Sequence, residues 1–207
     1  VIVQIRTAGD AFYPTTMAPW SRYLTGKQGE NTKLKIDPLE WLIETSHQYG
    51  MDFHAWINPY RATMTMDTSL LSEAHDFNKH PEWMVPYGSK YYYNPGLPEV
   101  QQHLITIVQD ITQRYNIDGI HLDDYFYPYK TKGALFKDHE AFVKFGNEQP
   151  INDWRRENIN RLIKGIQSAV KSEKPWVSFG VSPFGVWKNN HTDPRGSNTR
   201  AGQTTYD

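Results

Sequence analysis

Residues 117–128 read IDGIHLDDYFYP. The first half has the alternating aliphatic residues of a buried strand, and the strand then ends on two adjacent carboxylates, Asp123 and Asp124. Aspartate is depleted in strands, and a buried carboxylate without a partner costs free energy. Because side chains alternate along a strand, Asp123 shares a face with His121, whereas Asp124 turns toward the loop or a neighbouring strand. The stretch predicts a strand that delivers a carboxylate to a functional site.

Around this stretch the chain repeats one pattern of strand, loop and helix. We expect one helix capped by Asp37 and ended by Gly50, one that starts at Pro98, and one capped by Asn152 or Asp153. Strands that alternate with helices at this spacing predict parallel βαβ units. The expected strands are residues 1–6, 53–60, 119–126 and 176–185.

Open doubly wound sheets and closed barrels both contain such units, and two features favour the barrel. The long loops follow strands, where barrels build active sites, and the loop after the second strand has about forty residues. Polar residues recur near the strand ends, whereas a doubly wound sheet is apolar on both faces. We therefore predict an α/β (β/α)8 TIM-type barrel, with residues 1–207 as a partial barrel catalytic domain. The polar residues are Gln4 and Arg6; His54, Trp56 and Asn58; His121 and Asp123; Ser178 and Ser182.

The composition limits the class of protein. A net charge of −1 gives no electrostatic reason to expect a nucleic-acid partner, and the absence of cysteine excludes disulfides and thiolate metal sites. No apolar run approaches the roughly 20 residues of a transmembrane helix. The chain opens on a strand and stops without a terminator, so we expect a piece of a longer protein, with any export signal upstream.

The carboxylate pair is the first candidate for chemistry. Barrel enzymes place a nucleophile, a general base or a metal ligand at the C-terminal end of a strand, so Asp123 and Asp124 are the candidate catalytic residues. The structural alternative is a pair that caps the following turn and forms an ion pair with Arg6 or Arg61.

Aromatic and polar residues on the expected active face are candidates for binding. Aromatic rings stack on the apolar faces of sugars, and polar side chains at the rim bind the hydroxyls. Alternatively, the rings anchor the long loops, and the charged residues form a salt-bridge network. The candidate substrate-binding residues are Arg6, Asp10, Trp56, Asn58, Tyr60, Arg61, His121, Tyr125, Tyr127, Ser182, Phe184 and Trp187.

Other chemistries lack their motifs. There is no His-Glu-x-x-His motif, no glycine-rich phosphate loop and no Gly-x-Ser-x-Gly elbow. His75 and His80 fall in a polar loop, where we expect them to be solvated. We therefore expect no catalytic metal and no cofactor.

Five motifs in order resemble the bacterial family-10 glycosyl-hydrolase-like proteins, which are envelope-associated barrels related to glycosidases. The resemblance implies that the chain holds about barrel strands 2 to 5. It also implies hydrolysis of a polysaccharide, with peptidoglycan as the substrate class, and an exported protein of the periplasm or an outer-membrane lipoprotein. The motifs are QIRTAGDAFYPTTMAPWSRYLTG (residues 4–26), HAWINPYR (54–61), DGIHLDDYFYP (118–128), DWRRENIN (153–160) and KPWVSFGVSPFGVW (174–187).

A shorter match concerns the strand end alone. Asp123 is similar in position to the nucleophile of α-amylase and α-galactosidase barrels, in which a basic residue precedes it by two, here His121. Asp124 would bind substrate or tune Asp123, and the proton-donating acid stays open between Asp10, another loop acid and a residue outside this chain. Two rival functions are a carbohydrate-binding barrel without catalysis and a metal-dependent, polysaccharide deacetylase-like hydrolase.

Overall fold

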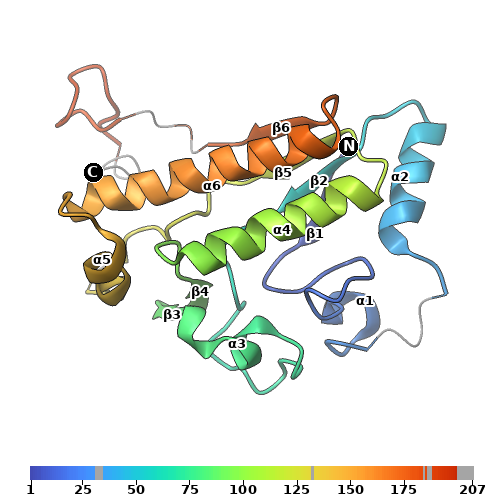
Figure 1. Cartoon of the computed structure of the whole chain (residues 1–207), viewed down its shortest axis with the longest axis horizontal. Helices are drawn as coiled ribbons and strands as arrows, with labels where there is room; N and C mark the ends of the chain where they lie inside the picture. Colours follow the sequence, from blue (N-terminus) through green and yellow to red (C-terminus); the bar gives the residue numbers. More distant parts are fainter. Residues whose placement is uncertain (31–34, 132, 184, 186–187, 200–207) are drawn as a thin grey trace.

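The computed structural model describes residues 1–30, 35–131, 133–183, 185 and 188–199. Its main sheet is parallel, and the strands lie across it in chain order (Figure 1). That order has no reversal point, whereas a doubly wound sheet reverses its strand order where the chain crosses to the other face. The strands are β1 (Ile2–Arg6), β2 (His54–Ile57), β5 (Gly119–Leu122) and β6 (Ser178–Val181).

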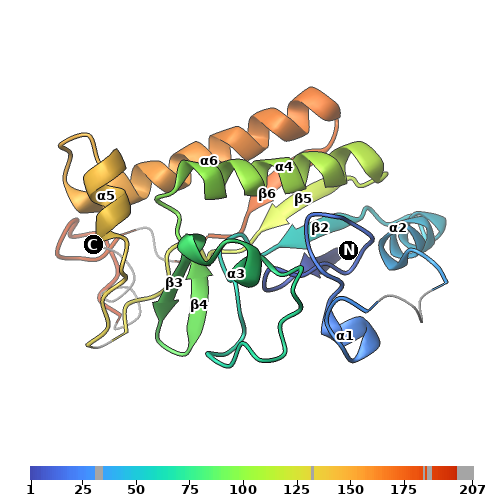
Figure 2. The same cartoon turned by 60° about the horizontal axis from the view of Figure 1, so that its bottom comes forward.

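Two long helices cover one face of this sheet. α4 (Pro98–Arg114) and α6 (Ile151–Glu173) lie side by side on it, and α2 (Pro38–Gln48) lies at the β1 end (Figures 1 and 2). Helices on one face of consecutive parallel strands are the arrangement of a (β/α) barrel. The four described strands therefore make part of such a barrel, as the sequence predicts.

Alternation along the strands separates core from site. Ile57, Ile120 and Leu122 are buried in the core with Leu104, Ile107 and Ile111 of α4 and Leu162 and Ile166 of α6. The intervening side chains, Trp56 and His121, lie on the opposite face and are partly exposed. The sheet thus has one apolar face under helices and one polar face.

The helix boundaries follow local capping chemistry at two of three expected starts. The Asp37 carboxylate accepts the backbone N–H groups of Leu39 and Glu40 at 2.9 and 3.3 Å, and Pro98 opens α4. The predicted cap at Asn152 or Asp153 is wrong. α6 begins at Ile151, directly after Pro150. Proline has no backbone N–H that would lack a partner at the helix start, so both polar residues lie inside the first turn.

The long segment after β2 contains ordered elements that the sequence pattern did not predict. They include an antiparallel hairpin, which stands at the C-terminal ends of the parallel strands (Figure 2). The elements are α3 (Asp76–Lys79), the 3-10 turn η1 (Pro81–Trp83), β3 (Met84–Tyr87) and β4 (Lys90–Tyr93). α1 (Arg22–Thr25) and α5 (His139–Phe145) lie in the loops after β1 and β5.

In the described part of the chain, no helix is long and apolar enough to cross a membrane.

Replacement of Ile107 by Ala should lower the free energy of unfolding by about 2–4 kcal/mol, because the side chain is 1% exposed between α4 and the sheet and its loss leaves a cavity. Chemical denaturation monitored by circular dichroism measures this loss. Gln102→Ala, at an exposed position of the same helix, is the matched control and should change stability by less than about 0.5 kcal/mol. Equal effects of the two substitutions would contradict the packing described here.

Candidate active site

Asp123 lies directly after β5 and is held by four contacts from N–H groups. Trp56 Nε1 donates to its Oδ2 at 3.1 Å, and Asn58 Nδ2 donates to Oδ2 at 3.0 Å and to Oδ1 at 3.3 Å. The backbone N–H of Tyr125 donates to Oδ1 at 3.3 Å. The residue is 7% exposed, so these donors replace much of the water that a carboxylate otherwise binds.

The pairing of β2 with β5 places these donors. Trp56 lies opposite His121 in the parallel register, so Asn58 and Asp123 both follow two residues later. Asn58 is fully buried; its backbone N–H donates to the Arg6 carbonyl at 3.0 Å, and its Oδ1 accepts the Arg61 N–H at 2.9 Å. The amide group therefore has a fixed orientation, with its Nδ2 directed at the carboxylate.

Asp124 does not share this environment. Its carboxylate accepts a hydrogen bond from the Tyr129 hydroxyl in the loop that follows the strand. Asp123 thus binds β2 and Asp124 binds the loop, which is the division that alternation predicts.

Arg61 lies beside Tyr125, one of two tyrosines that bind the carboxylate pair. The Arg61 guanidinium lies 5.2 Å from the centre of the Tyr125 ring, and the Tyr125 and Tyr129 rings are 5.5 Å apart. Tyr125 is 40% exposed and Tyr129 is 37% exposed. These side chains form an accessible aromatic and cationic surface beside Asp123.

Of two other candidate tyrosines, Tyr60 is buried and Tyr127 is partly buried. Tyr60 is fully buried, and the Tyr127 hydroxyl accepts a hydrogen bond from Asn158 of α6 at 3.1 Å. Burial raises the pKa of both phenols. The positions of Tyr60 and Tyr127 fit loop anchoring, the alternative that the sequence left open.

Arg6 belongs to a buried network rather than to the open sheet face. The register shift between Gln4 and Arg6 interrupts the alternation of β1, so the prediction that the two share a face is wrong. Arg6 is 1% exposed, donates to the Tyr93 hydroxyl at 3.2 Å and lies 3.8 Å from Asp76. Asp76 also accepts from Tyr93 at 2.7 Å and binds His103 at 3.0 Å. Burial raises the pKa of Asp76, but His103, Arg6 and Tyr93 outweigh burial and lower it to about 2.

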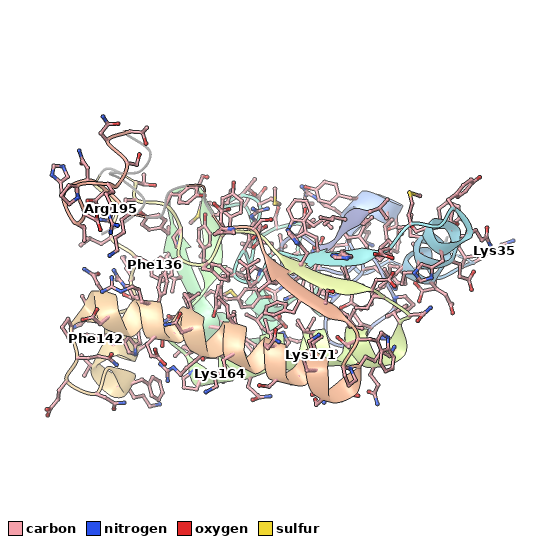
Figure 3. All side chains as sticks on the ribbon, turned by 90° about the horizontal axis from the view of Figure 1, so that it is seen from above. Lys35, Phe136, Phe142, Lys164, Lys171 and Arg195 are labelled. Carbon is pink, nitrogen blue, oxygen red and sulfur yellow. The ribbon has the colours of Figure 1, made fainter. Side chains whose placement is uncertain are left out.

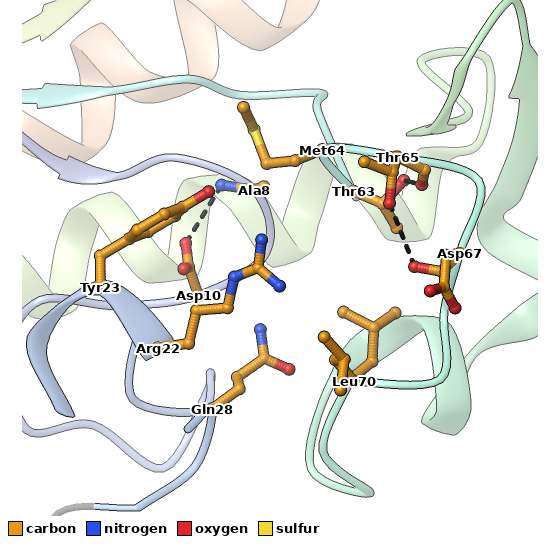
Figure 4. A pocket seen from close by; sticks show the side chains of 11 residues that line it. Ala8, Asp10, Arg22, Tyr23, Gln28, Thr63, Met64, Thr65, Asp67 and Leu70 are labelled. Carbon is orange, nitrogen blue, oxygen red and sulfur yellow. Dashed lines mark hydrogen bonds between the residues drawn. The ribbon is translucent and has the colours of Figure 1, made fainter. Parts of the chain in front are cut away.

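Asp10 is also buried and is turned toward its own loop. Its Oδ1 accepts from the Thr7 hydroxyl at 2.9 Å and from the Ala8 N–H at 3.1 Å. It lines a small pocket with Arg22, Gln28 and other residues, and Asp123 is not part of that lining (Figure 4). The Asp10 carboxylate thus binds its own loop, and none of these hydrogen bonds reaches Asp123.

On the open face, His121 Nε2 lies 3.1 Å from the Ser182 hydroxyl of the strand β6 end. Both side chains face the same side as Trp56, as predicted. Phe184 and Trp187 lie outside the described residues.

The expectation that His75 is solvated is wrong. His75 is fully buried, accepts the Phe77 N–H at Nδ1 and lies 3.1 Å from the Ala8 carbonyl through Nε2, so it joins the loops that follow β1 and β2. His80 is partly exposed and stacks on Trp83. Among the described residues, no group of three or more His, Cys, Asp or Glu could hold a metal ion.

Comparison with known families places the chain. A model of the glycosyl hydrolase-like 10 family matches residues 1–206. The chain belongs to this family. It is 48% identical to the glycosyl hydrolase YngK of Bacillus subtilis and 38% identical to the glycosyl hydrolase DigH of Escherichia coli, and each match covers the whole chain. The chain spans 41% and 48% of these relatives, which is less than half the length of each. The resemblance drawn from the five motifs is confirmed.

Solved structures confirm the fold. Alpha-L-fucosidase isoenzyme 2 from Paenibacillus thiaminolyticus superposes with a TM-score of 0.60 and 14% identity, over 93% of this chain and 28% of that one. The GH36 alpha-galactosidase AgaA from Geobacillus stearothermophilus gives 0.50 and 14%, over 87% and 23%. At these identities the likeness concerns the barrel fold alone, and the four parallel strands are part of such a barrel.

Replacement of Asp76 by Asn should lower the free energy of unfolding by about 3–5 kcal/mol, because it leaves the buried Arg6 without its counter-charge. The exposed pair of Asp153 with Arg156 provides the control, and Asp153→Asn should cost about 1 kcal/mol or less.

The same carboxylate predicts a pH dependence. The pKa of Asp76 falls from 3.8 to about 2 on folding, so its contribution of about 2 kcal/mol is complete above pH 4 and is lost as the pH falls through 2. Urea unfolding at several pH values measures it. The Asp76→Asn variant should lack this part of the acid dependence, and an identical pH profile in both proteins would contradict the assignment.

Proposed function

We propose that this family member is a glycoside hydrolase in which Asp123 is the nucleophile that attacks the anomeric carbon of a glycan. The observation that carries the proposal is the strand-end carboxylate held by Trp56, Asn58 and the Tyr125 N–H. The family match and the names of the two curated relatives support the reaction class.

The contacts of Asp123 favour a nucleophile over a proton donor. Its oxygens face only N–H donors among the contacts described above, and an ionised carboxylate accepts such bonds without a proton of its own. A nucleophile that is already oriented needs little rearrangement to reach the anomeric carbon. In a retaining mechanism the carboxylate forms the bond to the sugar while a second acid protonates the leaving oxygen, and water later releases the sugar.

The neighbouring side chains fit a sugar ligand. Trp56 is partly exposed on the open face and Tyr125 is exposed beside Asp123, so a sugar ring that reaches the carboxylate meets aromatic surface. Arg61 adds a cation to this surface. The proposed substrate class is the glycan strand of the bacterial cell wall, which lies outside the cytoplasm, and the proposal therefore includes an exported, envelope-associated protein.

The rival functions differ in what Asp123 does. A carbohydrate-binding barrel without catalysis would use the same aromatic surface and would bind glycans without cleaving them. A metal-dependent deacetylase-like enzyme would release acetate and leave the glycan chain intact. Product analysis therefore separates the three functions.

Replacement of Asp123 by Asn should lower kcat for glycan cleavage by about 10³-fold or more, because the amide is a poor nucleophile. Mass analysis of products from a panel of glycans that includes peptidoglycan gives the rates for the intact protein. Asp124→Asn is the matched control, one residue away, and should cost roughly tenfold or less. Azide added to Asp123→Gly should restore cleavage and yield a glycosyl azide; retention of full activity by Asp123→Asn would refute the assignment.

Replacement of Asn58 by Ala should lower kcat by about 10- to 100-fold, because it removes the buried amide that orients Asp123. The Trp56 indole still donates to this carboxylate in the variant, so part of the activity should remain. Asn78→Ala, at an exposed position, is the control. An unchanged rate in Asn58→Ala would show that the amide does not position the carboxylate.

A further inference from the structure

We propose that Tyr87, on strand β3 of the hairpin, is a positioning residue whose hydroxyl holds the loop after Asp123 in its substrate-binding conformation. The inference rests on the proposed function for its kinetic part and on the structure alone for its contacts.

The hydroxyl of Tyr87 joins two backbone groups of one short segment. It accepts the N–H of Thr131 at 2.7 Å and donates to the carbonyl of Tyr129 at 3.2 Å. The two partners are more than forty residues away in sequence, and Tyr87 is 8% exposed. A phenol in this position replaces the backbone partners that an irregular loop does not supply for itself.

The segment it holds carries the accessible surface beside the carboxylate pair. The Tyr129 carbonyl binds Tyr87, while the Tyr129 hydroxyl binds Asp124 and the Tyr129 ring lies 5.5 Å from Tyr125. The backbone of Tyr125 in turn binds Asp123. Tyr87 is thus linked through Tyr129 to both carboxylates.

The hairpin can serve as a support because its other strand is attached to the end of β2. Tyr93 N–H donates to the Tyr60 carbonyl at 2.8 Å, and Ala62 N–H donates to the Tyr91 carbonyl at 3.0 Å. The hairpin therefore connects the loop that follows β2, which holds Asn58 and Arg61, with the loop that follows β5.

Tyr92, on strand β4, provides an internal control for this contact, because it shares an aromatic neighbour with Tyr87. The Phe136 ring packs edge-on against Tyr87 at 5.8 Å and against Tyr92 at 6.5 Å, and it lies beside the hairpin (Figure 3). In the described part of the chain, the Tyr87 hydroxyl forms hydrogen bonds to the loop and the Tyr92 hydroxyl forms none. Removal of each hydroxyl therefore separates the hydrogen bonds from the aromatic packing.

The first test is hydrogen exchange on the intact protein without substrate. In Tyr87→Phe the Thr131 amide should exchange roughly 2- to 10-fold faster, because it loses its acceptor, whereas Tyr92→Phe should leave it unchanged. Equal exchange in wild type and Tyr87→Phe would overturn the proposal. Thermal unfolding of both variants shows whether the fold is retained. If Tyr87→Phe unfolds, Thr131→Pro removes the same N–H donor and takes its place in the kinetic test.

The second test is kinetic. With the peptidoglycan glycan strand as the probe, Tyr87→Phe should raise KM about fivefold and leave kcat within about twofold, and Tyr92→Phe should change neither. Faster exchange with an unchanged KM would show a purely structural hydroxyl and overturn the positioning role. If the unmodified protein cleaves no glycan, the proposed function fails. Exchange of the Thr131 amide, measured with and without the bound probe, then decides the role of Tyr87. The bound probe should slow this exchange in the wild type and should not slow it in Tyr87→Phe.

Discussion

The register between β2 and β5 is the constraint on which the candidate site depends. Parallel pairing sets Trp56 opposite His121, and the same two-residue step then brings Asn58 and Asp123 to the same end of the sheet. A shift of one residue would turn every one of these side chains to the opposite face, into the apolar layer under α4 and α6. Ile57 and Leu122 resist such a shift because each is buried in that layer. The core therefore fixes the geometry of the carboxylate and its donors.

Buried polar groups then fix the loops around this sheet. Arg6, at the end of β1, binds the hairpin through Tyr93 and the α3 turn through Asp76, and Asp76 reaches α4 through His103. A buried cation and carboxylate lose hydration, which their mutual attraction and added hydrogen bonds must offset. Their value here is geometric, because one guanidinium and one carboxylate join four segments. Arg6, a candidate substrate-binding residue in the sequence, is therefore used inside the protein.

Much of the fold was predictable, because alternation and helix starts at Asp37 and Pro98 are local signals. The hairpin of residues 84–93 was not, since its strands are short and one contains Pro86, which argues against a strand. The placement of Arg6 depends on the register shift between Gln4 and Arg6, which no residue type in β1 predicts. His75 has polar neighbours in the sequence and is nevertheless fully buried, because its surroundings come from distant segments.

The candidate site shows the same division between local and distant information. Strand alternation separated Asp123 from Asp124, and the contacts of the two agree with it. A proton donor must reach the leaving oxygen from the side opposite the nucleophile. In a retaining enzyme the two carboxyl groups lie about 5 Å apart. Asp124 is committed to Tyr129, and Asp10 binds its own loop. The ends of the described neighbouring strands carry Arg6, Asn58 and Ser182, none of which is an acid. On the proposed mechanism, this sheet supplies the nucleophile, and the acid comes from another loop or another part of the protein.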